Sequence, residues 1–178
     1  TETETSFYNE RQRVEIDLVK SLATDEKYGI GTNGEIFDVT FGLYASEELK
    51  AADGTVIPEG GLLEVIFLDE SGHGKAISDL PMGSYYVQEI STNSAYILDD
   101  TKYPVVFEYA GQETATVHIS ANDGNAIENE IIYGSVSGKK SDEDGNALGG
   151  ATLGIFKTGT AEFTKENAIA TATSKDDG

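Results

Sequence analysis

The stretch VEIDLVK, from Val14 to Lys20, alternates apolar and polar side chains as a half-buried β-strand does. Val14, Ile16 and Leu18 share one face of this predicted strand. One further step of the alternation places Lys20 on the same apolar face. A strand that ends there would let the ammonium group reach water along its aliphatic stem. Otherwise this lysine needs partners inside the core.

Short runs of the same kind recur along the 178 residues. Val, Ile, Thr, Tyr and Phe are concentrated in these runs, and the 20 glycines supply turns between them, whereas prolines number only 3. One run alternates from Phe37 through Phe41 to Leu43 and predicts a strand over these residues. No segment has a convincing helical period. The pattern predicts an all-β chain folded as an antiparallel β-sandwich.

The net charge is −20, with 32 acidic against 12 basic residues. Such a charge repels nucleic acid and anionic membrane surfaces, so neither is expected as a partner. No apolar run reaches the length that spans a membrane, which also argues against membrane contact in this segment. The chain has no cysteine, so disulfides and thiolate metal sites are excluded.

Motifs of catalysis and of cofactor binding are missing from the sequence, which has no Gly-rich phosphate loop and no Ser/His/Asp arrangement. The stretch SDEDGNALGG, residues 141–150, places Asp142 and Asp144 at a spacing that resembles a calcium loop. A complete EF-hand also needs flanking helices and a later bidentate Glu, so a hairpin turn is the better interpretation. His73 and His118 lack nearby metal-binding partners. We therefore expect no metal and no cofactor.

An internal repeat joins the two ends of the chain. FYNERQRVEIDLVK, residues 7–20, aligns without a gap on IENEIIYGSVSGKK, residues 127–140. Asn9 falls on Asn129, and the lysines that end the two stretches coincide. Repetition of this kind is typical of tandem modules.

The repeat predicts three segments. Residues 1–11 are interpreted as the last strand of a preceding module, residues 12–133 as a complete module, and residues 134–178 as the first part of a following, truncated module.

Three strands each direct one polar residue toward the apolar face. In GSYYVQEI, residues 83–90, Glu89 has the parity of the apolar positions. In AIENEII, residues 126–132, Asn129 does, as Lys20 does in the first strand. A lone buried group of this kind is costly unless it is paired, so the three are expected to meet. Spacing alone leaves open an ion pair hydrogen-bonded to an amide, side chains that reach the rim, or a reactive site.

Four stretches together resemble the Cna B-type, or SpaA-like, repeat modules of Gram-positive cell-wall surface proteins and pilins. They are DLVK, FGLYA, LPMGSYYVQEI and NEIIYGSVSGKKSDEDGNALGGATLGIF. This resemblance spans nearly the whole chain and implies a sandwich of the immunoglobulin/prealbumin-like type in tandem modules.

The resemblance further implies an isopeptide bond between the side chains of Lys20 and Asn129, promoted by Glu89. Lys20 would be the nucleophile, Asn129 the electrophile and Glu89 the assisting acid. Burial favours the neutral amine and the neutral carboxyl that this reaction needs. The equivalent residues Asn9 and Lys140 lack the rest of their own site in this chain, and we expect both to stay unreacted.

The function that the resemblance implies is structural: a stalk or shaft segment of a surface protein or pilin, extracellular on the bacterial cell wall or pilus. Self-crosslinking happens once per molecule, so the chain is not expected to be an enzyme. Expected partners are adjacent modules of the same polypeptide, other pilin subunits or host extracellular matrix. One alternative is an adhesin module that binds a host protein or glycan through its loops, with Tyr86 and Tyr133 as candidate contacts. Another is an enzyme accessory domain of transthyretin-like fold.

Overall fold

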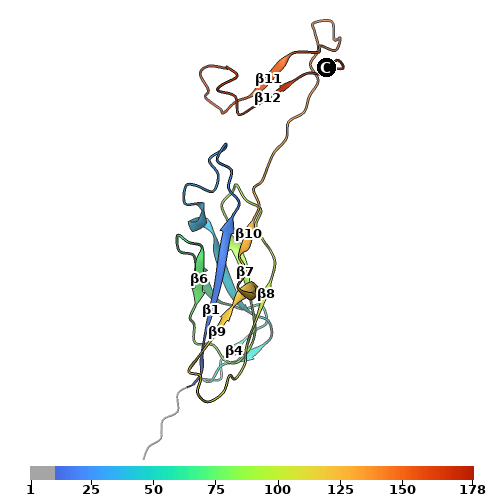
Figure 1. The fold of residues 1–178 in the computed structure, drawn as a ribbon. Helices are drawn as coiled ribbons and strands as arrows, with labels where there is room; N and C mark the ends of the chain where they lie inside the picture. The colour runs from blue at the N-terminus through green and yellow to red at the C-terminus, as the bar shows by residue number, and fades with distance from the viewer. Residues whose placement is uncertain (1–10) are drawn as a thin grey trace, which may run out of the picture. The chain divides into compact units, whose positions relative to one another are not determined.

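A computed structural model describes residues 11–178, and these residues separate into two compact units with a boundary between Ile132 and Tyr133 (Figure 1). Asn9, and nearly all of the predicted strand of a preceding module in residues 1–11, lie outside the described residues. Within the described part of the chain, no helix is long or apolar enough to span a membrane.

The described residues of the first unit form short strands and two 3-10 helices. In chain order these are β1 (Arg13–Leu22), η1 (Glu35–Asp38), β2 (Thr40–Ala45), β3 (Leu49–Lys50), β4 (Val56–Ile57), β5 (Leu62–Phe67), β6 (His73–Ala76), β7 (Gly83–Ser91), β8 (Tyr103–Phe107), β9 (Thr116–Ser120), η2 (Ala121–Gly124) and β10 (Ile127–Asn129). The second unit contains β11 (Thr152–Ile155) and β12 (Ala170–Thr173).

Two four-stranded sheets build the sandwich of the first unit, and β3 and β4 pair as a separate two-stranded sheet. One sheet is antiparallel with the strand order β5-β2-β7-β8. The other is built around β1, which pairs antiparallel with β6 and parallel with both β9 and β10. Figure 1 shows β1 with β6, β9 and β10 along its length. The predicted all-β sandwich is confirmed.

The core lies between these sheets and follows the alternation of the sequence. Val14, Ile16 and Leu18 of β1 are buried in one cluster with residues of the β5-β2-β7-β8 sheet, such as Phe41 and Val87. Full burial of an apolar side chain of this size stabilises the fold by about 1.5–3 kcal/mol. Intervening residues of β1 face outward, because successive side chains of a strand point to opposite faces.

The predicted strand over residues 37–43 is wrong in its first part. Residues 35–38 form η1, the strand begins at Thr40, and Phe37 is 61% exposed. The carboxylate of Glu35 accepts hydrogen bonds from the backbone N–H groups of Gly31 and Asn33, which closes the preceding loop. Local hydrogen bonds of this kind compete with the extended conformation that the alternation predicts.

The second unit consists of the antiparallel hairpin β11–β12 and the turns around it. No residue from Tyr133 to Gly178 is buried, and Leu153 and Ile155 of β11 are 48% and 44% exposed. A single two-stranded hairpin has little apolar surface to bury. That this unit is the first part of a following module stays a prediction.

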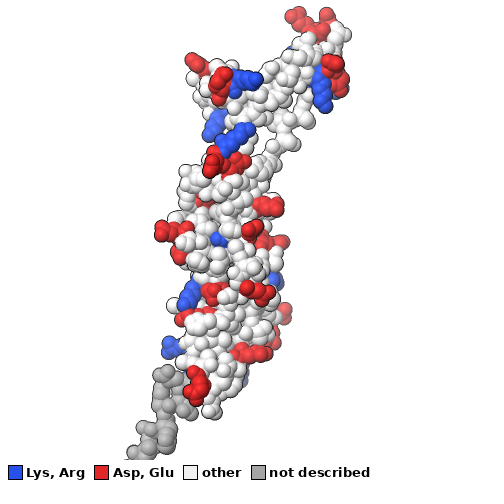
Figure 2. Space-filling view, viewed as in Figure 1, with Lys and Arg blue, Asp and Glu red and all other residues white. Residues whose placement is uncertain are grey.

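Acidic side chains are spread over the visible surface of each unit, and the basic side chains scattered among them are fewer (Figure 2).

Candidate functional site

The three polar residues predicted to face the core lie on three different strands. Lys20 is near the end of β1, Glu89 near the end of β7, and Asn129 is the last residue of β10. Their relative exposures are 2%, 4% and 2%, and they are the buried polar or charged residues of the described chain. Burial of such groups is costly without partners. The contacts among them therefore decide what the site can do.

Lys20 reaches across from β1 to β10. In the parallel register Lys20 is opposite Ile127, and Leu22 is opposite Asn129. Lys20 and Asn129 are thus diagonal neighbours on adjacent strands, a separation of about 7–8 Å that a long side chain can span. The Nζ of Lys20 donates a hydrogen bond of 2.9 Å to the carbonyl oxygen of Ile127. The amine is held beside the strand that carries Asn129.

The carboxamide of Asn129 is held by two acceptors on its nitrogen. Nδ2 donates to Oε1 of Glu89 at 2.7 Å and to Oγ1 of Thr92 at 3.0 Å. Its Oδ1 is buried and has no hydrogen-bond partner among the residues that the structure describes. A buried oxygen without a donor is rare in folded proteins and calls for an explanation.

The end of β7 places Glu89 and Thr92 on the same site. Thr40 of β2 pairs with Ser91, whereas Phe41 pairs with Glu89, so the register shifts and Ile90 is an extra residue on β7. An extra residue bends a strand and redirects the side chains beyond it. The Thr92 hydroxyl also lies close enough to the Glu89 carboxyl group to lower its pKa.

A second oxygen of Glu89 faces the loop that follows β7. Oε2 accepts a long hydrogen bond of 3.4 Å from the backbone N–H of Asp99. The carboxylate of Asp99 in turn accepts a hydrogen bond from the hydroxyl of Tyr103 on β8. Burial, together with the neighbouring carboxylate, raises the pKa of Tyr103 to about 12, so it stays a donor. This chain of contacts fixes the loop over the acid.

Burial shifts both ionisable groups of the site toward their neutral forms. Loss of hydration lowers the pKa of Lys20 to about 8, although the negative charge of Glu89 opposes the shift. Loss of hydration also raises the pKa of Glu89, against the hydrogen bond from Asn129 and the charge of Lys20. A neutral amine and a neutral carboxyl are the forms that nucleophilic attack and acid catalysis require.

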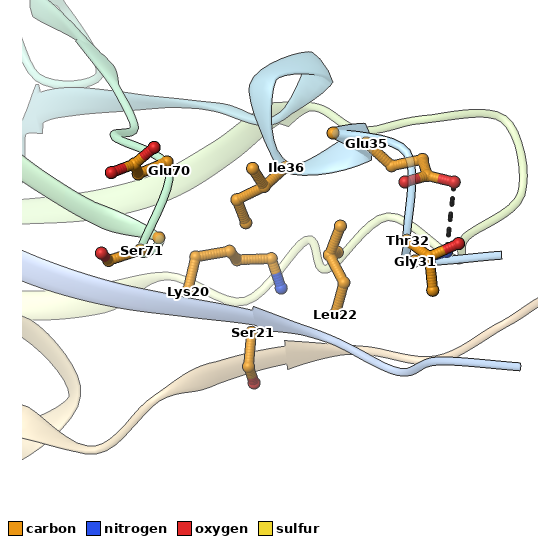
Figure 3. A pocket seen from close by; sticks show the side chains of 11 residues that line it. Lys20, Ser21, Leu22, Gly31, Thr32, Glu35, Ile36, Glu70 and Ser71 are labelled. Atoms are coloured by element: carbon orange, nitrogen blue, oxygen red, sulfur yellow. Dashed lines mark hydrogen bonds between the residues drawn. The ribbon is translucent and has the colours of Figure 1, made fainter. Parts of the chain in front are cut away.

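A cavity of about 400 Å³ opens beside Lys20 (Figure 3). It is lined by Lys20, Ser21, Leu22, Gly31, Thr32, Gly34, Glu35, Ile36, Glu70, Ser71 and Gly72. In Figure 3 the Lys20 side chain extends between Ile36 and Leu22. The cavity brings space for water and small solutes next to a lysine that is otherwise enclosed.

Gly72 holds the backbone of Lys20 in place. The carbonyl oxygen of Gly72 accepts a 2.8 Å hydrogen bond from the N–H of Lys20. Gly72 has a φ of +79°, and a Cβ built there would lie 2.1 Å from the Lys20 carbonyl oxygen. Only glycine fits such a conformation and such a close approach.

Further residues singled out in the sequence belong to the second unit. Lys140 is half-buried, and its Nζ donates to the carbonyl oxygen of Ser141 at 2.7 Å. The side chain of Asp142 accepts hydrogen bonds from the backbone N–H groups of Asp144 and Asn146, so SDEDGNALGG begins with a turn, as predicted. No cluster of three or more metal-binding side chains occurs in residues 11–178.

Tyr86, a predicted ligand contact, is engaged within the chain. Its ring stacks on Tyr44 with centroids 5.1 Å apart, and the Nζ of Lys102 lies 4.4 Å from the ring centroid. Tyr133 is 64% exposed.

Sequence reasoning missed Thr92, Asp99 and Tyr103. Thr92 follows Glu89 by three residues, and this closeness was the available signal. Hydroxyl and carboxyl groups in polar loops are too common for their position alone to indicate a site.

The fold and the buried residues define a module of the immunoglobulin/prealbumin-like sandwich class. A family model described as "SpaA: Prealbumin-like fold domain" matches residues 24–125, which is more than half of the chain. The chain therefore belongs to the SpaA prealbumin-like domain family. No curated protein is similar enough to count as a relative.

Solved structures with a similar fold include bacterial pilins. The minor pilin GBS52 of Streptococcus agalactiae is 24% identical over 71% of this chain and 48% of its own, with a TM-score of 0.40. The major pilin BcpA of Bacillus cereus is 20% identical over 66% of this chain and 29% of its own (TM-score 0.35). The TIE protein of Bacillus anthracis is 16% identical over 91% of this chain and 26% of its own (TM-score 0.49). The chain thus spans less than half the length of each of these proteins.

Proposed function

We propose that the first unit is a structural module of a Gram-positive surface protein or pilus, and that it stabilises itself through an isopeptide bond between Lys20 and Asn129. The observation that carries this proposal is the burial of Lys20, Glu89 and Asn129 in one place, with the carboxamide of Asn129 hydrogen-bonded to Glu89. The reaction needs these three chemical groups and no cofactor.

The proposed reaction exchanges one amine for another at a carbonyl carbon. The neutral Nζ of Lys20 attacks Cγ of Asn129, and the electron pair of the carbonyl moves to Oδ1. The new Nζ–Cγ bond is kept, the Cγ–Nδ2 bond breaks, and Nδ2 leaves as ammonia with a proton that came from Nζ. Glu89, already hydrogen-bonded to Nδ2, carries that proton from the one nitrogen to the other.

Folding lowers the activation barrier of the reaction by holding the two groups in the correct orientation. In water an amine and a carboxamide react extremely slowly, but correct orientation can remove about 7–11 kcal/mol of the barrier in the best cases. Lys20 and Asn129 are oriented by the parallel pairing of β1 with β10. The reaction occurs once, so the module is its own substrate and no turnover follows.

The bond would tie the first strand of the unit to the last. It closes a loop of about a hundred residues, for which chain entropy alone predicts a stabilisation of about 4–5 kcal/mol, by analogy with a disulfide. The chain enters the unit at β1 and continues from β10 into the second unit. A pulling force along the polypeptide would then pass through the covalent bond instead of separating β1 from β10.

This role implies the surroundings in which the module works. We propose that its immediate partners are neighbouring modules of the same polypeptide, with residues 134–178 as the first part of the next one, and that it is displayed outside the cell on the wall or pilus. A chain without cysteine has no disulfides to resist unfolding there, and an isopeptide bond serves the same purpose.

Intact mass under denaturing conditions tests the proposal. The purified chain is expected to be lighter than its sequence mass by one ammonia, and the Lys20→Ala and Glu89→Ala variants are expected to have their full sequence masses. If the chain without substitutions has its full sequence mass, the proposed crosslink is wrong.

A further inference from the structure

The orientation of the Asn129 carboxamide does not yet suit the reaction. Its nitrogen occupies the position between Glu89 and Thr92, while Oδ1 is buried without a donor. Negative charge develops on Oδ1 when Lys20 attacks, and an oxygen in an apolar interior needs donors at that moment. An unpaired buried oxygen is already unfavourable before any charge develops.

Rotation of the carboxamide by 180° about its Cβ–Cγ bond exchanges the two positions. Oδ1 would then occupy a place about 2.7 Å from Oε1 of Glu89 and about 3.0 Å from Oγ1 of Thr92. A protonated carboxyl group donates one hydrogen bond, and a hydroxyl group donates another. The same two side chains that accept from Nδ2 can therefore donate to Oδ1.

We infer that Thr92 is a further catalytic residue of the self-crosslinking reaction, acting with Glu89 as one of two donors to the carbonyl oxygen of Asn129. This inference rests on the proposed isopeptide bond and deepens it. The distances are those of an oxyanion hole, in which donors lie about 2.7–3.1 Å from the oxygen that becomes charged.

The position of Thr92 supports this role. The side chain is half-buried in the loop that follows β7, just beyond the extra residue Ile90. Its single hydroxyl accepts a 3.0 Å hydrogen bond from the carboxamide of Asn129 and lies close enough to Glu89 to lower the pKa of that carboxyl group. A hydroxyl that only closed the loop would not need to contact either reacting group.

The chemical step is balanced in this arrangement. As Nζ of Lys20 bonds to Cγ, Oδ1 becomes an alkoxide that accepts hydrogen bonds from the Thr92 hydroxyl and the Glu89 carboxyl group. When the carbonyl re-forms, its electron pair returns from Oδ1 and the Cγ–Nδ2 bond breaks. Glu89 accepts one proton from Nζ at one carboxyl oxygen and gives its own proton to Nδ2 from the other, so Nδ2 leaves as ammonia and Glu89 ends neutral, while Thr92 keeps its proton throughout.

The test compares the rates at which variants of the 178-residue chain form the crosslink. Each chain is made by cell-free synthesis. The reaction is stopped in denaturant at a series of times, and the intact mass of the chain is measured by mass spectrometry. Thr92→Val keeps the shape of the side chain but removes its hydroxyl, and Thr92→Ser restores a hydroxyl. Thr40→Val is the matched control. It makes the same change at a threonine whose hydroxyl is hydrogen-bonded to Ser91, at 2.8 Å, and not to Asn129.

Thr92→Val is expected to lose ammonia about 10²-fold more slowly than the unmodified chain, the usual effect of removing one such donor. Thr92→Ser and Thr40→Val are expected to react at nearly the original rate. The pH profile provides a second measurement, since the Thr92 hydroxyl lowers the pKa of Glu89. Removal of the Thr92 hydroxyl should therefore shift the part of the rate–pH profile that depends on Glu89 toward higher pH.

Two results would overturn the inference separately from the proposed function. If the unmodified chain loses ammonia and Thr92→Val loses it equally fast with the same pH profile, Thr92 has no catalytic role while the crosslink stands. If Thr92→Val is slow and Thr92→Ser equally slow, the effect is one of packing and the inference fails. If the unmodified chain never loses ammonia, the proposed function and the inference fall together.

Discussion

Lys20 and Asn129 enter the same buried space from neighbouring parallel strands, two positions apart in the register. The amine of Lys20 is hydrogen-bonded to the backbone of Ile127, and the carboxamide of Asn129 is hydrogen-bonded to Glu89. The amine is thus oriented by Ile127, a residue of the strand that carries Asn129, and the carboxamide by Glu89, whose charge acts on Lys20. This arrangement leads to four predictions besides the test of Thr92.

Loss of the crosslink should lower the stability of the first unit substantially. Asn129→Ala removes the electrophile, and the free energy of unfolding is expected to fall by at least about 4–5 kcal/mol, the chain-entropy effect of a closed loop of this length. Denaturant unfolding followed by circular dichroism measures the change. Lys50→Ala, on the exposed side of β3, is the control and should leave the midpoint nearly unchanged. Equal midpoints for Asn129→Ala and the unmodified chain would contradict the prediction.

The uncrosslinked Asn129→Ala chain should become more stable as the pH rises from about 8 toward 10.5. Burial lowers the pKa of Lys20 from 10.5 to about 8, so in this range the unfolded chain binds more protons than the folded one. Stability therefore rises with pH, by up to about 3 kcal/mol for a shift of this size.

Denaturant unfolding at a series of pH values tests this dependence. The matched control is the double variant Lys20→Ala/Asn129→Ala, which lacks the titrating amine and should lose the rise. The crosslinked chain should lose it too, because an amide nitrogen does not titrate in this range. A rise of the same size in all three chains would assign the effect to other groups.

Gly72→Ala should destabilise the fold far more than a glycine substitution elsewhere. A Cβ at this position would lie 2.1 Å from the carbonyl oxygen of Lys20, in addition to the left-handed conformation at φ +79°. Gly54 has φ +88° and nothing within 4 Å of its Cβ position, so Gly54→Ala has only the conformational cost of about 1–2 kcal/mol. Thermal unfolding compares the two variants, and similar melting temperatures would show that the contact with Lys20 relaxes freely.

Lys140 should take no part in any crosslink of this chain. It is half-buried, and its amine is hydrogen-bonded to the adjacent carbonyl of Ser141. Lys140→Ala should therefore show the same loss of one ammonia as the unmodified chain, and peptide mapping should locate the bond between Lys20 and Asn129. A loss of two ammonias from the unmodified chain would show that a second site reacts.

Much of this site could be predicted from the sequence, because strand alternation is a local property. Successive side chains point to opposite faces, so the parity of Lys20, Glu89 and Asn129 with their apolar neighbours was enough to predict that all three face the core. The same reasoning predicted a β-sandwich and an Asp-rich turn at residues 141–150. It did not predict η1, because the hydrogen bonds of Glu35 to the preceding loop override the alternation around Phe37.

What the sequence by itself determined is therefore which side chains face the core and which class of fold buries them. Only the tertiary structure decided how those side chains meet: the parallel register that sets Lys20 opposite Ile127, the position of Thr92 on both reacting partners, and the unpaired oxygen of Asn129. The physical reason is one of range. The direction of a side chain follows from its immediate neighbours in the strand. Register and hydrogen-bond partners depend on residues 37 to 107 positions away, which only the folded chain brings together.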